Sequence, residues 1–183
     1  ILWTTEQLES TGLSFDEMAL QIDQFVRQQL APRWEELAEP EHEQRHQLSI
    51  ELVTAAQGLF GSEPNQSAAS RLLFFLCPQL PVFPFSEGHL RVVLQLCPDL
   101  PIEGYGDYHQ ACRQLLAKNM PRIYPQPPQS QSHCRSERVA VNQMMSQTDW
   151  WPRRVLAQQL LEQGQALNIG STAFGRQSAP QAA

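Results

Sequence analysis

The stretch LCPQLPVFPFSEGHLRVVLQLCPDLP, residues 76–101, contains one hexapeptide pattern twice, with only a Gln-to-Asp difference between the copies. The first copy begins at Leu76 and the second at Leu96. Proline disfavours helical backbone in the residue before it and lacks the N–H that the next helical hydrogen bond needs. We therefore interpret each Cys-Pro as the end of a helix, and each following Leu-Pro as a return of the chain to the core. A tandem repeat would carry further likeness through the twenty residues between the copies, and we find none, so we interpret the two copies as two turns.

Apolar side chains recur at helical spacing on both sides of these turns. A capping box at Ser14–Glu17 predicts a helix over about 15–30, and Pro40 suits the first turn of a second helix that ends near Gly61. Further helices are predicted over 67–77, 87–96, from the Gly104–Asp107 turn to Pro121, over 136–145, and from Thr148 or Asp149 onward. The sequence thus predicts an all-α, single-domain bundle of about six or seven helices.

The segment Pro81-Val82-Phe83-Pro84-Phe85 alternates in the manner of a strand, but its prolines predict a loop. We place the helical domain at 1–166, with a mobile connector at about 125–134. The Gly-, Ser- and Ala-rich residues 167–183 are expected to form a flexible tail.

The net charge of −6 argues against a general nucleic-acid binder. Residues 1–63 carry twelve acidic side chains and three arginines, a net charge of −9, whereas residues 64–183 carry a net charge of +3. This asymmetry predicts an acidic face and a mildly basic one. No apolar run approaches the ~18 residues of a membrane span, so we expect a cytoplasmic protein. Because the chain begins at Ile1 rather than methionine, we expect it to be a piece of a longer protein.

The four cysteines, at positions 77, 97, 112 and 134, include no Cys-x-x-Cys pair. Zinc ribbons need such pairs, because two ligands on one tight turn pre-form half of the coordination sphere. We therefore expect mostly buried free thiols, with a disulfide framework as the alternative in an oxidising compartment. We expect no bound cofactor.

The segment His42-Glu43-Gln44-Arg45-His46 matches His-Glu-x-x-His, a pattern that resembles the zincin metalloproteases. That resemblance implies His42 and His46 as zinc ligands and Glu43 as the general base, with Glu63 as a candidate third ligand. The flanking side chains are polar, whereas the zincin helix is apolar around its histidines. We therefore favour a solvated helix start and keep a zinc-dependent hydrolase as the alternative.

The segment Trp150-Trp151-Pro152-Arg153-Arg154 places two aromatic rings beside two arginines at a helix start. Such a cluster can bind a partner by stacking and by its guanidinium groups, or a tryptophan can simply anchor the helix in the core. We favour a non-enzymatic helical binding protein that engages a protein or nucleic-acid partner through its basic C-terminal half. A structural or assembly protein that uses its acidic N-terminal helices is a further alternative. The candidate binding residues are Arg71, Arg91, Trp150, Arg153 and Arg154.

Two blocks of the chain resemble known bacterial proteins. The first is Ser67–Leu76 with the following Pro78 and Leu80–Phe83, and the second is Asp149–Leu156. Together they resemble a family of bacterial helical proteins without an assigned activity. The first block also resembles, more weakly, proteins with the helical fold of 8-oxoguanine DNA glycosylases. Those enzymes use a lysine and an aspartate, where this chain has Arg71 and Phe85-Ser86, so the resemblance implies the helical fold without the catalysis.

Overall fold

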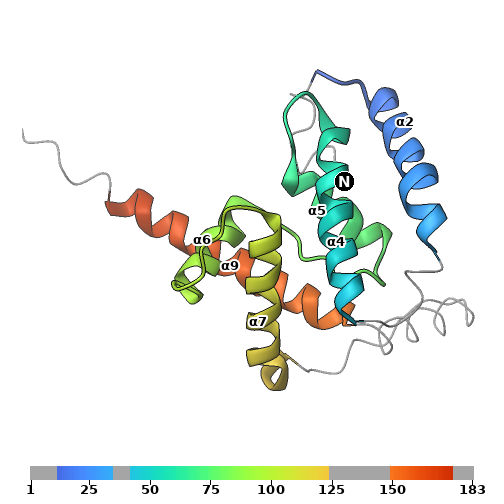
Figure 1. Cartoon of the computed structure of the whole chain (residues 1–183). Coiled ribbons are helices and arrows are strands. Elements are labelled where there is room, and N and C mark those ends of the chain that lie inside the picture. Colours follow the sequence, from blue (N-terminus) through green and yellow to red (C-terminus); the bar gives the residue numbers. More distant parts are fainter. Residues whose placement is uncertain (1–11, 35–41, 124–148, 175–183) are drawn as a thin grey trace, which may run out of the picture.

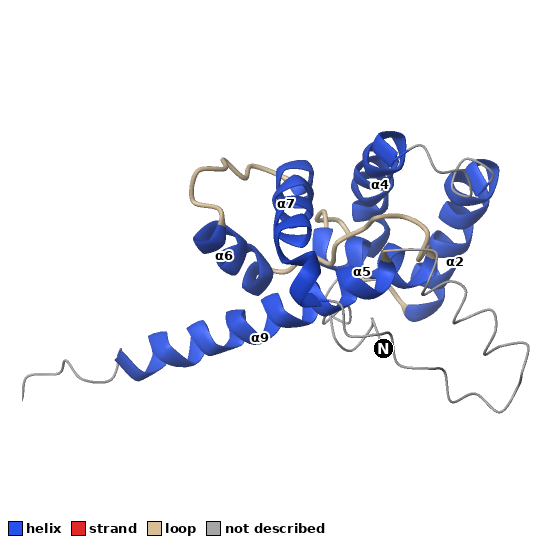
Figure 2. Ribbon diagram, turned by 90° about the horizontal axis from the view of Figure 1, so that it is seen from below, coloured by secondary structure: helices blue, strands red, loops and turns tan. Residues whose placement is uncertain are grey.

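The computed structural model describes residues 12–34, 42–123 and 149–174. Within these ranges the chain forms six α-helices and no strand, which confirms the predicted all-α fold (Figure 2). The predicted connector at 125–134, the predicted helix at 136–145 and residues 175–183 lie outside the described residues. No helix in the described ranges has the length and apolar character needed to cross a bilayer.

The first described helix, α2 (Phe15–Phe25), begins at the predicted capping box. The Ser14 Oγ accepts the Glu17 N–H at 3.2 Å, and the Ser14 N–H donates to the Glu17 carboxylate at 2.8 Å. The helix continues through a wider turn, η2 (Val26–Leu30), and a tighter one, η3 (Ala31–Arg33). The predicted helix over about 15–30 is confirmed.

Helices α4 (His42–Ala56) and α5 (Gln66–Leu76) pack against each other and are joined by η4 (Gln57–Phe60). Gly61 follows η4 with a φ of 140°, a backbone conformation that favours glycine. This confirms Gly61 as the predicted end of the second helix. At the start of α5 the Asn65 Oδ1 accepts the Ala68 N–H at 2.9 Å.

The two Cys-Pro turns are nearly identical. Helix α5 ends at Leu76 and α6 (Glu87–Leu96) ends before Cys97, as predicted. At each turn the cysteine N–H donates to the carbonyl four residues earlier, and the cysteine carbonyl accepts the N–H of the leucine three residues later. These distances are 2.9 and 3.0 Å at Cys77, and 2.8 and 3.2 Å at Cys97.

The likeness of the two units extends further than we expected from the sequence. Arg-Leu-Leu-Phe-x-Leu in α5 (71–76) aligns with Arg-Val-Val-Leu-x-Leu in α6 (91–96), and the two central apolar side chains are buried in both helices. Both units therefore combine one buried stripe with one proline turn, so the hexapeptide is the C-terminal part of a longer helix–turn unit that occurs twice in the chain.

Helix α7 (Tyr105–Ile123) ends two residues past Pro121, where we expected it to stop. Helix α9 (Trp150–Phe174) continues eight residues past the predicted boundary at 166. Gly164 lies inside α9, at the point where this helix crosses α6 at very short range. A Cβ atom at Gly164 would lie only 2.7 Å from the carbonyl oxygen of Gly88.

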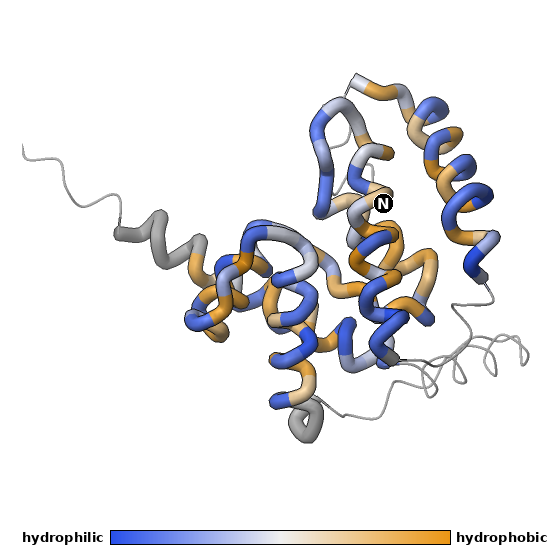
Figure 3. Tube along the Cα trace, viewed as in Figure 1, coloured by the Kyte–Doolittle hydropathy of each residue, from blue (hydrophilic) through white to orange (hydrophobic). Residues whose placement is uncertain are grey.

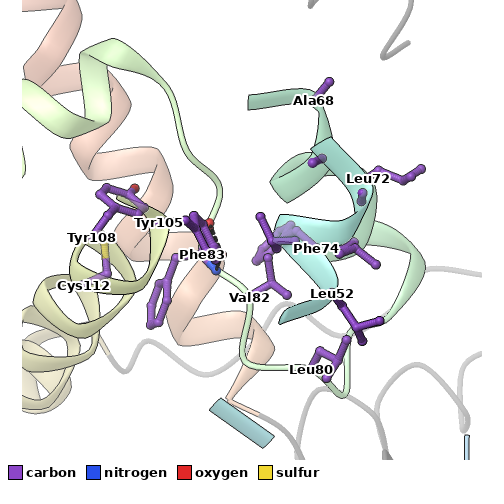
Figure 4. Close-up of a cluster of buried hydrophobic side chains, with 14 of the residues drawn as sticks. Leu52, Ala68, Leu72, Phe74, Leu80, Val82, Phe83, Tyr105, Tyr108 and Cys112 are labelled. Carbon is purple, nitrogen blue, oxygen red and sulfur yellow. Dashed lines mark hydrogen bonds between the residues drawn. The ribbon is translucent and has the colours of Figure 1, made fainter. Parts of the chain in front are cut away.

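Helices α2, α4 and α5 lie on one side of the molecule and α6 and α7 on the other, with α9 running past both groups (Figure 1). Apolar positions concentrate where these elements meet (Figure 3). At the centre, the loop between α5 and α6 carries Val82 and Phe83 between α7 and the α4–α5 pair (Figure 4). The core is thus organised around a loop rather than around a helix.

Candidate functional site

The loop of residues 77–86 has no regular secondary structure, although its residues Pro81 to Pro84 are buried. Buried backbone N–H and C=O groups must find hydrogen-bond partners, because leaving one unpaired costs about 1–3 kcal/mol. Three prolines in this loop remove three donors and leave carbonyls that need a donor from elsewhere. Side chains of α5, α7 and α9 supply those donors.

Helix α7 contributes two tyrosines and a histidine. The Tyr105 hydroxyl donates to the Phe83 carbonyl at 2.9 Å and accepts the Phe83 N–H at 3.1 Å. The Tyr108 hydroxyl donates to the Pro84 carbonyl at 2.7 Å. Burial raises the pKa of both phenols, so both stay protonated and keep their donors.

Helix α9 contributes Arg153, whose side chain is completely buried. Its Nη1 donates to the Val82 carbonyl at 2.8 Å, its Nη2 to the Pro78 carbonyl at 2.8 Å, and its Nε to the Asp149 carboxylate at 3.0 Å. The guanidinium carbon also lies 5.7 Å from the ring centroid of Phe74. Burial lowers the pKa of Arg153 and the Asp149 charge opposes that shift, so the guanidinium stays charged inside the protein.

Helix α5 closes the arrangement from the third side. The Ser70 Oγ accepts the Phe85 N–H at 2.9 Å, and the Ser67 hydroxyl donates to the Phe85 carbonyl at 3.0 Å. The Trp150 indole N–H, from the first turn of α9, donates to the Phe74 carbonyl at 3.1 Å. Side chains from three helices therefore make the hydrogen bonds to the loop backbone that regular secondary structure would otherwise provide.

Two buried histidines extend the cluster. The His109 Nε2 lies 2.8 Å from the Pro81 carbonyl and 3.4 Å from the His46 Nδ1. Because a carbonyl only accepts, the His109 Nε2 carries the proton and the His46 Nδ1 is the acceptor. Burial lowers the pKa of His109 to about 4, with the nearby Arg113 and Arg153 acting in the same direction.

The elements of the His-Glu-x-x-His pattern engage different partners. His46 is buried and packs on His109, so the predicted solvated helix start is wrong at this position. The exposed Glu43 carboxylate pairs with the Arg113 guanidinium. The side chain of His42 lies outside the described residues. No group of three metal-ligating side chains occurs within the described ranges.

Glu63, the candidate third zinc ligand, lines an open hollow of about 680 Å³ at the N-terminal ends of α5 and α6. Glu87 and the partly buried Phe85 line the same hollow. His46 is not among its lining residues.

The described cysteines are buried thiols, as expected: Cys77, Cys97 and Cys112 form no disulfide. Burial raises the pKa of Cys77 to about 11 and that of Cys112 to about 12. These two thiols are therefore protonated at neutral pH, which makes them poor nucleophiles. Cys134 lies outside the described residues.

The structure gives the five candidate binding residues different environments, and it brings Trp150 and Arg154 together. Arg153 is committed to the loop and is not accessible to a partner. Arg91 lies 3.5 Å from Glu87, and Arg71 lies near enough to His89 to lower its pKa. Arg154 is exposed, with its guanidinium carbon 5.6 Å from the Trp150 ring centroid.

The described surface around Trp150 is aromatic and cationic. The Trp150 ring stacks on Phe74 with centroids 5.6 Å apart, and the Phe75 ring meets the Phe74 ring edge-on with centroids 5.2 Å apart. The Phe75 side chain is 60% exposed and that of Leu76 41%. We call Phe75, Leu76, Trp150 and Arg154 the aromatic patch. Next to it, the buried Arg153 binds the Pro78 and Val82 carbonyls and lies over the Phe74 ring, and these contacts hold the start of α9 against the end of α5.

The sequence analysis did not predict that Tyr105, Tyr108 and His109 form hydrogen bonds to the loop backbone. The available signal was the three prolines spaced three residues apart, at 78, 81 and 84, within an apolar segment. Such a segment, once buried, needs several side-chain donors, and tyrosine, histidine and arginine are the residues that supply them.

No protein-family model, curated protein or solved structure matches the chain. The resemblances to bacterial helical proteins and to the glycosylase fold therefore stay predictions. The geometry of the site is therefore the basis for a proposed function.

Proposed function

We propose that this chain is a non-enzymatic helical binding module that engages a protein partner through the aromatic patch. The observation that carries this proposal is the exposure of Phe75 and Leu76 at the end of α5, directly after Phe74, on which Trp150 packs with Arg154 over its ring. Tryptophan, other aromatic residues and arginine are enriched at the energetic centres of protein interfaces. A rigid support lowers the entropic cost of binding.

The arrangement favours a protein over a nucleic acid. Phosphate binding relies on several arginines or lysines that reach the surface. Arg153 is buried and Arg91 lies beside Glu87, which leaves Arg154 as the exposed guanidinium of the aromatic patch. One cation beside apolar side chains suits a partner helix that presents an apolar side chain flanked by carboxylates.

The buried cluster gives no support to catalysis. Its tyrosine, histidine and arginine donors are occupied by the carbonyls of the loop, and its thiols are protonated. A general acid or base must reach a reacting group on the substrate. The cluster therefore serves to position the aromatic patch.

The test is binding of a fluorescent helical peptide that carries leucine at helical spacing with flanking glutamates, measured by anisotropy. The intact chain should bind it, and a Phe75→Glu/Arg154→Glu variant should bind at least about tenfold more weakly, the loss of one good contact. Leu94→Glu on α6, also an exposed leucine (43%), is the matched control and should bind normally. Equal affinities for all three proteins would refute the aromatic patch as the site. Preferential binding of a single-stranded oligonucleotide, falling steeply with salt, would favour the nucleic-acid alternative.

A further inference from the structure

The outer face of α2 carries the chemistry that the aromatic patch would bind. Leu20 is 57% exposed on this helix, and Asp16 and Asp23 lie four residues before it and three after it, on the same face. The opposite face of α2 buries Met18 and Phe25 in the core. We call Asp16, Leu20 and Asp23 the outer face of α2. It presents Leu20 between two carboxylates. That of Asp23 pairs with the exposed Arg27 at 2.9 Å, whereas that of Asp16 forms no ion pair within the described residues.

The two surfaces differ in sign and share apolar character. The part of the chain that contains α2 is strongly acidic, whereas the half that contains the aromatic patch is net basic. Within the described residues no carboxylate pairs with Arg154, whose charge is therefore available to an incoming carboxylate. Because Leu20 and Phe75 are both largely exposed, they do not cover each other within one chain.

From this complementarity we propose that α2 of one copy docks on the aromatic patch of a second copy. The inference rests on the proposed function of the aromatic patch and names its occupant. Leu20 packs on Phe75 and Leu76, while a carboxylate of α2 approaches the Arg154 guanidinium. The contact is heterologous, since it joins two different surfaces, so each added copy leaves one surface of each kind open. The copies therefore associate head to tail, and a contact of this small size is weak and reversible.

Sedimentation velocity over a range of protein concentrations tests this inference. The intact chain should sediment faster as its concentration rises, without a plateau at a dimer. Leu20→Glu and Phe75→Glu should each stay monomeric, and the Leu94→Glu control should associate like the intact chain. Because all three positions are exposed, the variants should keep their helical circular dichroism and their melting temperatures.

Mixing the two monomeric variants is the decisive measurement. The Leu20→Glu chain keeps its aromatic patch and the Phe75→Glu chain keeps its α2 face, so an equimolar mixture should form a one-to-one dimer and stop there. A mixture that stays monomeric, or an intact chain that never associates, would overturn head-to-tail docking. Peptide binding by the Leu20→Glu monomer separates the two proposals. If that monomer binds the acidic peptide while the intact chain does not self-associate, only the self-docking inference falls. If it binds no peptide either, the proposed function falls as well.

Discussion

Replacing Arg153 with methionine should strongly destabilise the protein, although residue 153 lies outside every predicted apolar stripe. The substitution keeps an unbranched side chain but removes the donors to the Pro78 and Val82 carbonyls and the partner of Asp149. Each buried carbonyl left without a donor costs about 1–3 kcal/mol. The Asp149 side chain is 37% exposed and can be partly rehydrated, so its loss of a partner adds little.

We therefore expect Arg153→Met to lower the free energy of unfolding by about 2–6 kcal/mol, the combined cost of two carbonyls left without a donor. Urea denaturation followed by circular dichroism measures this loss. At a slope of about 2 kcal/mol per molar, the midpoint should fall by roughly 2 M. Arg154→Met is the matched control, because its side chain is exposed, and it should change the stability by no more than about 0.5 kcal/mol.

The stability of Arg153→Lys should lie between those of Arg153→Met and Arg154→Met. A single ammonium group cannot reproduce the planar guanidinium that reaches two carbonyls and a carboxylate. Equal urea midpoints for Arg153→Met and Arg154→Met would refute a stabilising role of the Arg153 hydrogen bonds. That outcome would mean that water or a shifted side chain serves the loop carbonyls equally well.

Two further predictions concern acid and helix packing. Burial lowers the pKa of His89 and of His109 to about 4, so at falling pH the unfolded chain, with its histidine pKa near 6.5, takes up protons before the folded one does. Stability should therefore fall as pH drops from about 6.5 toward 4, by about 2 kcal/mol for each histidine between pH 7.5 and pH 5. Urea denaturation at both pH values checks this, and a His89→Gln/His109→Gln variant that kept the full pH dependence would contradict it. Gly164→Ala should lower stability by about 1–3 kcal/mol, because its Cβ would meet the Gly88 backbone 2.7 Å away and force α6 and α9 apart. Gly58→Ala, with open space around the new methyl group, is the control, and equal melting temperatures for the two variants would refute the close crossing.

Local patterns in the sequence were enough to predict most of the helix boundaries. The capping box at Ser14, the periodic apolar stripes and the two Cys-Pro ends are short-range features, because each depends on residues within about one turn of one another. They located the starts and ends of α2, α5 and α6 well. The extension of α9 through Gly164 escaped prediction, since it depends on close contact with a second helix.

The role of Arg153 could not be predicted for the same reason. Beside two tryptophans and a second arginine, it reads as part of a surface cluster, and the local sequence does not distinguish it from Arg154. The difference arises because Pro78 and Val82, more than seventy residues earlier, place their carbonyls at the side chain of 153 alone. Long-range hydrogen bonds of this kind are set by the packing of α5, α7 and α9.

The central claim is that side chains, rather than backbone pairing, hold the loop of residues 77–86 in the core. Native-state hydrogen exchange of the Phe83 and Phe85 amides tests it most directly, because their N–H groups donate to the Tyr105 hydroxyl and the Ser70 Oγ. We predict that both amides exchange as slowly as the Leu73 amide inside α5, through global unfolding alone. Exchange of either amide at the rate of an open surface loop, while Leu73 stays protected, would contradict the account.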